Sequence, residues 1–191
     1  GGLILDGQVT MGSMNLTTDR RVEFLGTRQT LSSDDSDTLF SAGIGASYDL
    51  ESGIGTLSPG VEARYASVDL ASVEELGGPL GLQVNRESYR SAQARGGLDY
   101  ETSGEMFQVN ATAQMVWEFE DGPQLLSAQF VRGNGPAANF VVDGADRTWG
   151  EVGIGATIGD GPVTLGFGFD ATIGRSTANT QVWSAEATWR F

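Results

Sequence analysis

The chain has 191 residues, of which 11 are basic and 25 acidic, for a net charge of −14, and every basic residue is arginine. Histidine, cysteine and lysine are absent, which excludes Cys/His zinc sites, disulfides, thiol nucleophiles, a histidine general base and a P-loop. The acidic balance also argues against nucleic acid as a partner, because a phosphate-binding face needs clustered basic side chains.

A period of two in hydropathy runs along almost the whole chain and predicts β-strands. In chain order, we expect eleven strands at 2–14, 20–30, 38–50, 56–69, 84–100, 106–119, 125–132, 137–143, 149–159, 162–172 and 180–191. Glycine supplies 28 residues, many at alternate positions, where each would cost a helix about 1 kcal/mol. The sequence therefore predicts an all-β fold.

The two faces of these strands differ in a way that bears on their surroundings. In 107–119 the odd positions are almost all apolar, whereas the even positions include Gln108, Asn110 and Glu118. A soluble all-β domain is an alternative, but its solvated face would be rich in Lys and Glu and poor in glycine. Long strands that alternate apolar outward and small or polar inward are typical of outer-membrane barrels. We therefore expect an antiparallel transmembrane β-barrel in the outer membrane.

The lengths of the connections orient this expected barrel. Bacterial barrels have short periplasmic turns, longer outer loops and an even number of strands. With the C-terminus on the periplasmic side, the longest connection, 70–83, falls outside, as does the acidic segment 31–37. The same path assigns to the periplasm the turns 51–55, 101–105, 133–136 and 160–161, and Arg20 and Arg21 as well. Eleven strands then put Gly1 outside, so we expect one strand missing before it and a complete barrel of twelve.

Several segments resemble the C-terminal translocator domain of bacterial autotransporters, the type V secretion proteins of Gram-negative bacteria. They are LSPGVEARYASVDLASVEE (57–75), VWEFE (116–120), NFVVDGADRTWGEVGIGATI (139–158) and EATWRF (186–191). In addition, DRRVEFLGTRQ (19–29) is similar to the subgroup that carries lipase or esterase passengers. The resemblance covers 1–191 as one translocator domain, which we expect to lack its first strand and its linker helix. It implies a twelve-stranded barrel and a linker helix through the lumen, joined to an upstream passenger.

The polar face of the predicted strands carries charged residues that we expect to line the lumen and to pair with one another. These are Glu62, Arg64, Arg95, Glu118, Glu151, Asp170, Glu186 and Arg190. A pair of carboxylates acting as acid and base is a further hypothesis, but spacing in the sequence gives no distance between them. Glycines on the same face would thin the wall so that another segment can pass close to it.

Aromatic residues near strand ends predict the two girdles that mark membrane interfaces. The expected girdle residues are Tyr48, Tyr65, Tyr100, Trp117, Phe119, Trp149, Trp183 and Trp189. The resemblance also implies that Trp189 and Phe191, in the closing strand, are read by the outer-membrane barrel-assembly machinery.

The predicted function is that of a translocator and anchor for an exported N-terminal passenger, with outer-membrane lipid, lipopolysaccharide, the assembly machinery and its own passenger as partners. We expect a monomer without a cofactor or resident metal. Calcium bound by Asp34, Asp35 and Asp37 is an alternative for that acidic segment. A stand-alone structural or adhesive barrel or a narrow pore is the alternative function. We do not expect an enzyme, since the barrel enzymes of this membrane depend on histidine.

Overall fold

The computed structural model describes residues 1–102, 104, 106–133, 135–159, 162–176 and 179–190. Its strands are β1 (Leu3–Phe24), β2 (Thr27–Tyr48), β3 (Leu50–Ser52), β4 (Gly55–Asp69), β5 (Val73–Glu74), β6 (Leu82–Arg86), β7 (Tyr89–Glu101), β8 (Phe107–Glu118), β9 (Gln124–Phe130), β10 (Ala138–Val142), β11 (Thr148–Ile158), β12 (Val163–Ile173) and β13 (Gln181–Trp189). No helix in this described part is long and apolar enough to cross a membrane. The all-β, antiparallel fold predicted from the alternation is confirmed.

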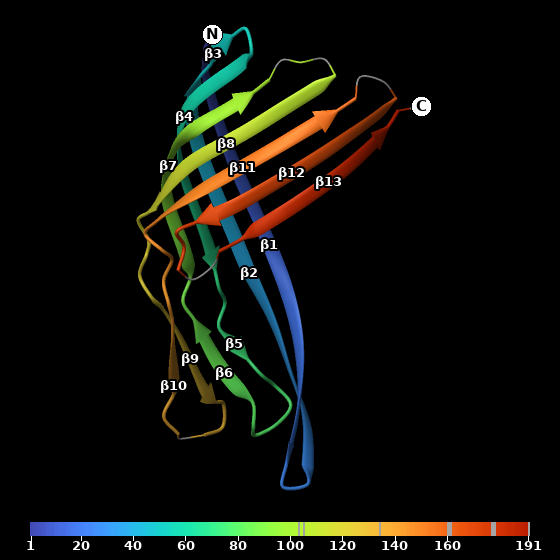
Figure 1. The fold of residues 1–191 in the computed structure, drawn as a ribbon. Helices are drawn as coiled ribbons and strands as arrows, with labels where there is room; N and C mark the ends of the chain where they lie inside the picture. The colour runs from blue at the N-terminus through green and yellow to red at the C-terminus, as the bar shows by residue number, and fades with distance from the viewer. Residues whose placement is uncertain (103, 105, 134, 160–161, 177–178, 191) are drawn as a thin grey trace.

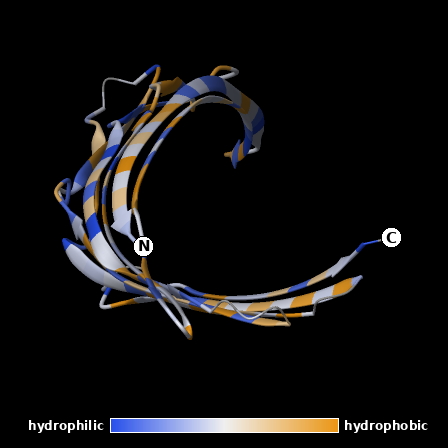
Figure 2. Cartoon of the chain, turned by 90° about the horizontal axis from the view of Figure 1, so that it is seen from above, coloured by the Kyte–Doolittle hydropathy of each residue, from blue (hydrophilic) through white to orange (hydrophobic). Residues whose placement is uncertain are grey.

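The strands form two sheets (Figure 1). The larger sheet, which we call the wall, has the order β1-β2-β4-β7-β8-β11-β12-β13, with β3 beside β4. Seen from above, the wall curves around an open interior and so has a concave and a convex face (Figure 2). The smaller sheet has the order β10-β9-β6-β5.

The first two strands form one very long hairpin. They pair without interruption from Leu3↔Tyr48 to Phe24↔Thr27. Leu25 and Gly26 close the hairpin with positive φ angles of 49° and 77°, the conformation of a two-residue turn that matches the strand twist. The prediction of separate strands at 2–14 and 20–30, with 31–37 as a loop, is therefore wrong. Residues 15–19, between the two predicted strands, belong to β1, and residues 31–37 belong to β2.

The strand count also differs from the predicted eleven. The segments predicted as strands at 125–132 and 137–143 contain β9 and β10, which lie in the smaller sheet. The segment predicted at 84–100 divides into the end of β6, in the smaller sheet, and β7, in the wall. As a result β8 pairs directly with β11, and the main path of the wall contains eight strands.

The connections divide the wall into two ends. Short connections join β2 to β4, β7 to β8 and β11 to β12 at what we call the short-turn rim. Both chain ends lie at this rim (Figure 1): the Gly1 ammonium is 3.3 Å from the Glu51 carboxylate, and the Arg190 N–H donates to the Pro162 carbonyl over 2.8 Å. The prediction that Gly1 lies at the opposite end from the C-terminus is wrong, because an even number of strands returns the chain to the same rim.

The opposite end, which we call the long-loop rim, continues into a second region. We define the extension as residues 13–38 of the hairpin together with β5, β6, β9 and β10. The connection between β9 and β10 lies at the far end of this region, away from the short-turn rim (Figure 1). Arg20 and Arg21 also lie in the extension. Their assignment, with 133–136, to the same side as the C-terminus is therefore wrong.

Two sets of contacts attach the smaller sheet to the hairpin. Arg20 donates two hydrogen bonds to the Glu75 carboxylate over 2.8 and 2.5 Å. Arg86 donates to Asp35 and Asp37 over 2.5 and 3.0 Å. A backbone bridge between Ser32 and Leu76 places β5 beside the outer half of β2, so that the hairpin and the smaller sheet form a continuous surface.

The polarity of the two faces is reversed between the wall and the extension. In the wall half of β1, Leu5 and Val9 lie on the convex face, and Asp6 and Gln8 on the concave face. Because β1 pairs with β2 without a bulge, even-numbered residues stay on the concave side of the ladder. Beyond residue 13 this side carries apolar residues at Met14, Leu16, Val22 and Phe24, and the opposite side is polar at Ser13, Asn15, Thr17, Asp19, Arg21 and Glu23.

Candidate functional site

The concave face of the wall gathers most of the charged residues that the sequence predicted as lumen-lining. The register places Glu62 and Arg64 of β4, Arg95 of β7, Glu118 of β8, Glu151 of β11, Asp170 of β12 and Glu186 of β13 on this one face. Arg190 follows β13 at the short-turn rim. These positions follow from the strict alternation of side chains along paired strands.

Two arginines on the concave face pair with carboxylates. Arg64 Nη2 lies 2.8 Å from Glu62 Oε1 on the same strand. Arg95 Nη1 lies 3.2 Å from Glu151 Oε2, which comes from β11. Glu151 also accepts a 2.8 Å hydrogen bond from the Gln114 side chain. β8 runs between β7 and β11, so this cluster ties three adjacent strands together through their inward side chains.

The Glu118 carboxylate is held by hydrogen bonds from neutral groups and not by an arginine. Its side chain is 2% exposed and accepts hydrogen bonds from Ser91 Oγ (2.6 Å), Gln93 Nε2 (3.1 Å) and two backbone N–H groups, those of Ala92 (2.8 Å) and Glu120 (3.0 Å). Four donors can hold a buried carboxylate in its charged form without a counter-ion. Glu118 therefore fixes the long-loop ends of β7 and β8 to each other.

Glycines leave room for the polar side chains of neighbouring strands. A Cβ at Gly153 would lie 2.6 Å from Asp170 Oδ1 and 2.8 Å from Thr112 Cγ2, so the side chains from both flanking strands fold over this position. A Cβ at Gly97 would lie 2.5 Å from the Ala113 carbonyl oxygen and 2.8 Å from Gln114 Cα. These glycines keep the concave surface thin and allow close packing of adjacent strands.

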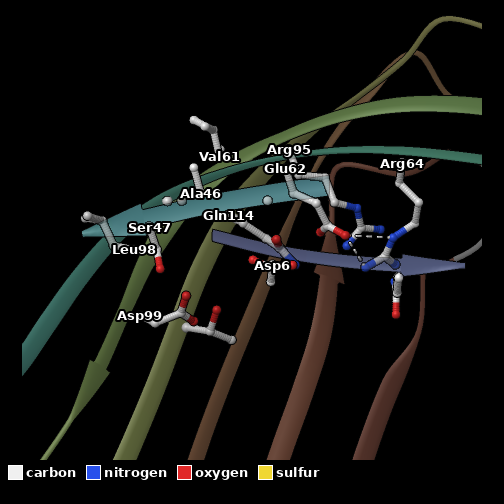
Figure 3. Close-up of a pocket in the computed structure, with 16 residues that line it drawn as sticks. Asp6, Ala46, Ser47, Val61, Glu62, Arg64, Arg95, Leu98, Asp99 and Gln114 are labelled. Carbon is white, nitrogen blue, oxygen red and sulfur yellow. Dashed lines mark hydrogen bonds and ion pairs between the residues drawn. The ribbon is translucent and has the colours of Figure 1, made fainter. Parts of the chain in front are cut away.

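A polar hollow of about 420 Å³ occupies the concave face where β1, β2, β4, β7 and β8 lie side by side. Its charged lining comes from Asp6, Glu62, Arg64, Arg95 and Asp99. Figure 3 shows the ion-paired Glu62, Arg64 and Arg95 grouped at one end, with Val61 and Ala46 directed to the other side of the sheet. The hollow therefore offers charge of both signs to anything that passes along the interior.

Neither Asp170 nor Glu186 forms an ion pair with another described residue, although Glu186 accepts a 3.1 Å hydrogen bond from Thr188. Among the predicted lumen residues, Glu62–Arg64 and Arg95–Glu151 form ion pairs. The other predicted lumen residues are spread over the wall. No two carboxylates are brought together here by a shared contact.

Trp149 does not lie with the other predicted girdle residues. It is on the concave side, 4% exposed, and its indole N–H donates to Glu151 Oε1 over 2.8 Å. The Arg175 guanidinium stacks over its ring at 4.5 Å. The prediction assigned Trp149 to the girdle from its place near a strand end, whereas the alternation along β11 puts its side chain on the same side as Glu151. Its place in the girdle set is corrected accordingly.

The other predicted girdle residues share the convex face. Tyr65, Trp117, Phe119 and Trp183 lie towards the long-loop rim, and Tyr48, Tyr100 and Trp189 towards the short-turn rim. Exposed fractions reach 76% for Trp183 and 73% for Trp189. Large exposed aromatic side chains at both ends of one face are the arrangement expected of a membrane-facing surface. Phe191 lies outside the described residues.

Sequence reasoning missed the contacts that attach the extension. Arg20, Glu75 and Arg86 were either assigned to turns or not considered, because their partners are about 50 residues away in the chain. Asp35 and Asp37, considered as calcium ligands, are paired with Arg86, and Asp34 accepts a hydrogen bond from Thr17. The described residues contain no group of three or more His, Cys, Asp or Glu residues able to hold a metal ion.

A comparison with protein-family models decides the family. Residues 1–172 match the autotransporter β-domain. The chain belongs to the autotransporter β-domain family. This domain is a translocator: it sits in the outer membrane of Gram-negative bacteria as a β-barrel, exports a passenger in type V secretion and anchors it. No curated protein matches the chain.

Membership in the autotransporter family explains the distribution of side chains on the wall. The convex apolar face of this β-domain is the face towards lipid, and a translocator, unlike a catalytic domain, needs a polar interior rather than an assembled set of reacting groups. The exposed apolar residues of the wall, such as Ile44 (68% exposed), Val61 (66%) and Phe167 (55%), match the apolar outer face of a membrane barrel.

Proposed function

We propose that the concave face of the wall is the surface along which the passenger segment passes and on which its linker comes to rest. The observation that carries this proposal is the polar hollow, which combines paired charges of both signs with glycines that bring the backbone close to the interior. Glu62, Arg64, Arg95, Glu151, Asp170 and Glu186 then bind a passing backbone transiently and catalyse nothing. Glu118 contributes by holding the rim rather than by touching the passenger.

We propose further that the short-turn rim faces the periplasm and the extension faces the outside. The support is the difference in connection length between the two rims, because short turns lie on the periplasmic side in barrels of this type. Arg190 and the end of β13 then lie at the periplasmic side, where Trp189, and Phe191 as the resemblance implies, are available to the barrel-assembly machinery. Lipopolysaccharide surrounds the aromatic residues near the long-loop rim. The working unit is a monomer.

Closure of the barrel follows from the same reasoning. Among the described residues, β1 and β13, the ends of the main path of the wall, each have one edge without a partner strand, and an open sheet edge is not stable in lipid. We propose that additional strands close the wall. A total of twelve, as the resemblance implies, requires four more strands rather than the single one expected from the sequence.

Cysteine accessibility in the full-length protein tests the assignment of the faces. The 191 residues contain no cysteine, so Gln114→Cys on the concave face and Ala113→Cys on the convex face form a matched pair on one strand. In intact outer membranes, a water-soluble maleimide is expected to label Gln114→Cys and to leave Ala113→Cys unlabelled.

A second cysteine in the passenger linker completes this test. An oxidative cross-link from Gln114→Cys to the linker, and none from Ala113→Cys, is the expected result. Passenger on the cell surface without any cross-link from the concave position would contradict the proposed route. Steady conductance of porin size in planar bilayers would favour the alternative of an open pore.

A further inference from the structure

An apolar groove of about 680 Å³ lies on the convex face of the wall, where β1, β2, β4 and β7 run side by side. We call it the outer groove. Small side chains form its floor: Ala42, Ala63, Ala92 and Ala94. Larger side chains form its walls: Ile44, Tyr65 and Phe119. The volume is in the range of sites that bind small molecules.

A second, polar hollow adjoins the outer groove at the long-loop rim. This rim hollow has a volume of about 390 Å³ and is lined by residues from the β6–β7 and β8–β9 connections. Arg90, in its lining, is the next residue on the outward side of β7 beyond Ala92. Glu120, also in its lining, directly follows Phe119. The apolar groove therefore ends in a polar hollow, the combination that binds a ligand with an apolar chain and a polar head.

The charged groups of the rim hollow are available to a ligand. The side chains of Glu87, Arg90 and Glu120 are exposed, and none of them forms an ion pair with another described residue. The Glu87 carboxylate accepts one hydrogen bond, from the Leu125 N–H over 2.9 Å. An arginine binds phosphate through paired N–H groups, and a carboxylate accepts hydrogen bonds from hydroxyl and amide groups.

The strand ends that carry the two hollows are fixed from the other side of the sheet. Glu118 accepts hydrogen bonds from the N–H groups of Ala92 (2.8 Å) and Glu120 (3.0 Å). One of these groups belongs to β7 and the other follows β8. A surface that is already ordered loses little entropy when it binds a ligand, which favours a binding role.

The rim hollow lies where the convex face changes from apolar to polar. The register aligns Arg90 with Ser67, and Ser67 with Phe40. Phe40 is the last apolar residue on the convex face of β2, and Thr38, the next residue outward on that face, is polar. With the convex face towards lipid, the outer groove meets acyl chains and the rim hollow meets the headgroup layer.

We propose that the outer groove and the rim hollow together bind one molecule of lipopolysaccharide from the outer leaflet. An acyl chain lies over Ala92 and Ala94. A phosphate binds Arg90, and sugar hydroxyl groups donate to Glu87 and Glu120. Lipopolysaccharide is the occupant because the long-loop rim faces the outer leaflet in the proposed orientation, and because its phosphates and hydroxyl groups complement a cation flanked by carboxylates. The inference rests on that orientation and adds to it a specific lipid site.

Native mass spectrometry of the full-length protein, purified in detergent and stripped of lipid, tests the ligand. The probe is lipid A, the phosphorylated glycolipid that anchors lipopolysaccharide. Lipid A without its phosphates and phosphatidylglycerol are the comparison lipids. One molecule of lipid A is expected to bind, and both comparison lipids are expected to bind about tenfold more weakly or less, since each lacks charge-assisted hydrogen bonds. Equal binding of either comparison lipid would overturn the inference.

Two matched pairs of variants test the site. Arg90→Gln removes the phosphate contact, whereas Arg132→Gln removes an exposed arginine from the β9–β10 connection. Ala94→Phe fills the outer groove, whereas Ala113→Phe adds the same ring to the convex face of β8 outside the groove. The first member of each pair is expected to weaken lipid A binding about tenfold, and the second to leave it unchanged. Equal affinities within either pair would overturn the inference.

Barrel formation by each variant is followed by its heat-sensitive mobility in gels, and the orientation is tested independently. The 191 residues contain no cysteine, so Arg132→Cys provides a single label site in this part of the protein. A membrane-impermeant maleimide is expected to label it on intact cells. Absence of labelling would contradict the proposed orientation and, with it, the choice of lipopolysaccharide. Labelling together with equal affinities in the variant pairs would overturn the lipid site alone and leave the translocator function intact.

Discussion

The wall and the extension are built from the same alternating strands, but their apolar residues lie on opposite sides. In the wall, apolar side chains such as Ile44 and Val61 face outward and Gln8 and Glu62 face inward. In the extension, Met14 and Leu16 take the inward side, and Asn15 and Thr17 the outward side. A sheet therefore orients its residues by the medium on each side, which is lipid outside the wall and water outside the extension.

With the convex face of the wall assigned to lipid, as proposed above, the reversal marks the point at which the hairpin leaves the membrane. Met11 and Phe40 form the last apolar pair on the convex face, and Ser13 and Thr38, two residues farther along the same face, are polar. The backbone ladder continues through this point without a break. The change of medium alone is sufficient to account for it, because nothing in the hydrogen-bonding of the strands differs between the two halves.

The largest difference in the free energy of unfolding is expected between a variant with an arginine on the outward face of the wall and a variant with one on the outward face of the extension. Ile154→Arg, on the convex face of β11, is expected to reduce the free energy of unfolding by about 2–4 kcal/mol, the cost of a charge at the lipid midplane. Val141→Arg, on the outward side of β10 and 64% exposed, is expected to change it by less than about 0.5 kcal/mol, as an ordinary surface substitution does.

Urea unfolding of the full-length protein reconstituted in lipid vesicles measures both variants. Equal losses of stability at the two positions would mean that the extension also lies in lipid. An unaffected Ile154→Arg variant would mean that the inside and outside of the wall are exchanged.

The strands of the wall were predictable because apolar and polar residues alternate along each of them, and because each strand has a different medium on its two faces. The period of two in hydropathy predicted β-strands. The small, glycine-rich face opposite the apolar face predicted a barrel. The wall places the charged set from Glu62 to Glu186 on one face, and the lumen-lining role of these residues stays a prediction. Trp149 lies beside Glu151 and not on the convex face with the other expected girdle residues.

The extension was not predictable in the same way. Residues 15–19 form a polar stretch between two apolar runs. The apolar positions change from odd to even numbers there, and in the sequence alone such a change resembles a loop between two strands. The contacts that define the region join residues such as Arg20 and Glu75, 55 positions apart. No local pattern specifies which of several acidic residues an arginine will meet, so the strand count and the position of Gly1 were also wrong.

A smaller effect is expected from adding a methyl group at the two neighbouring glycines of β7. At Gly97, on the concave face, the new Cβ would lie within 2.5–2.8 Å of the Ala113 carbonyl oxygen and of Gln114. Gly97→Ala is expected to lower the free energy of unfolding by about 1–3 kcal/mol, as overpacking does.

Gly96→Ala is the matched control, since its nearest atoms, in Trp117 and Val61, lie 3.7 and 3.9 Å away. It is expected to be neutral or to stabilise the fold by up to about 1 kcal/mol through the reduced entropy of the unfolded chain. The same vesicle assay applies. Comparable losses at both positions would show that the concave face is no more closely packed than the convex one.

The smallest expected effect is a local response of the extension to pH. The hydrogen bonds from Arg20, the largest influence, hold the pKa of the Glu75 carboxyl below its usual value of 4.5. A carboxylate with a lowered pKa in the folded state contributes stability above its unfolded pKa and loses it as the pH falls through the folded value. The protection of the amides in residues 70–86, relative to their intrinsic exchange rates at each pH, is therefore expected to fall below pH 4.5, before that of the wall strands does.

Glu75→Gln removes the titrating group while keeping a hydrogen-bond acceptor, so the variant is expected to exchange faster at neutral pH and to lose most of the change with pH. The Arg28–Glu23 pair at the hairpin tip, exposed on both partners, provides the comparison, because exposed ion pairs contribute little. Glu23→Gln is expected to leave the exchange profile of residues 70–86 as it is. A profile that keeps its pH dependence in Glu75→Gln would contradict the assignment of the response to the Arg20–Glu75 pair.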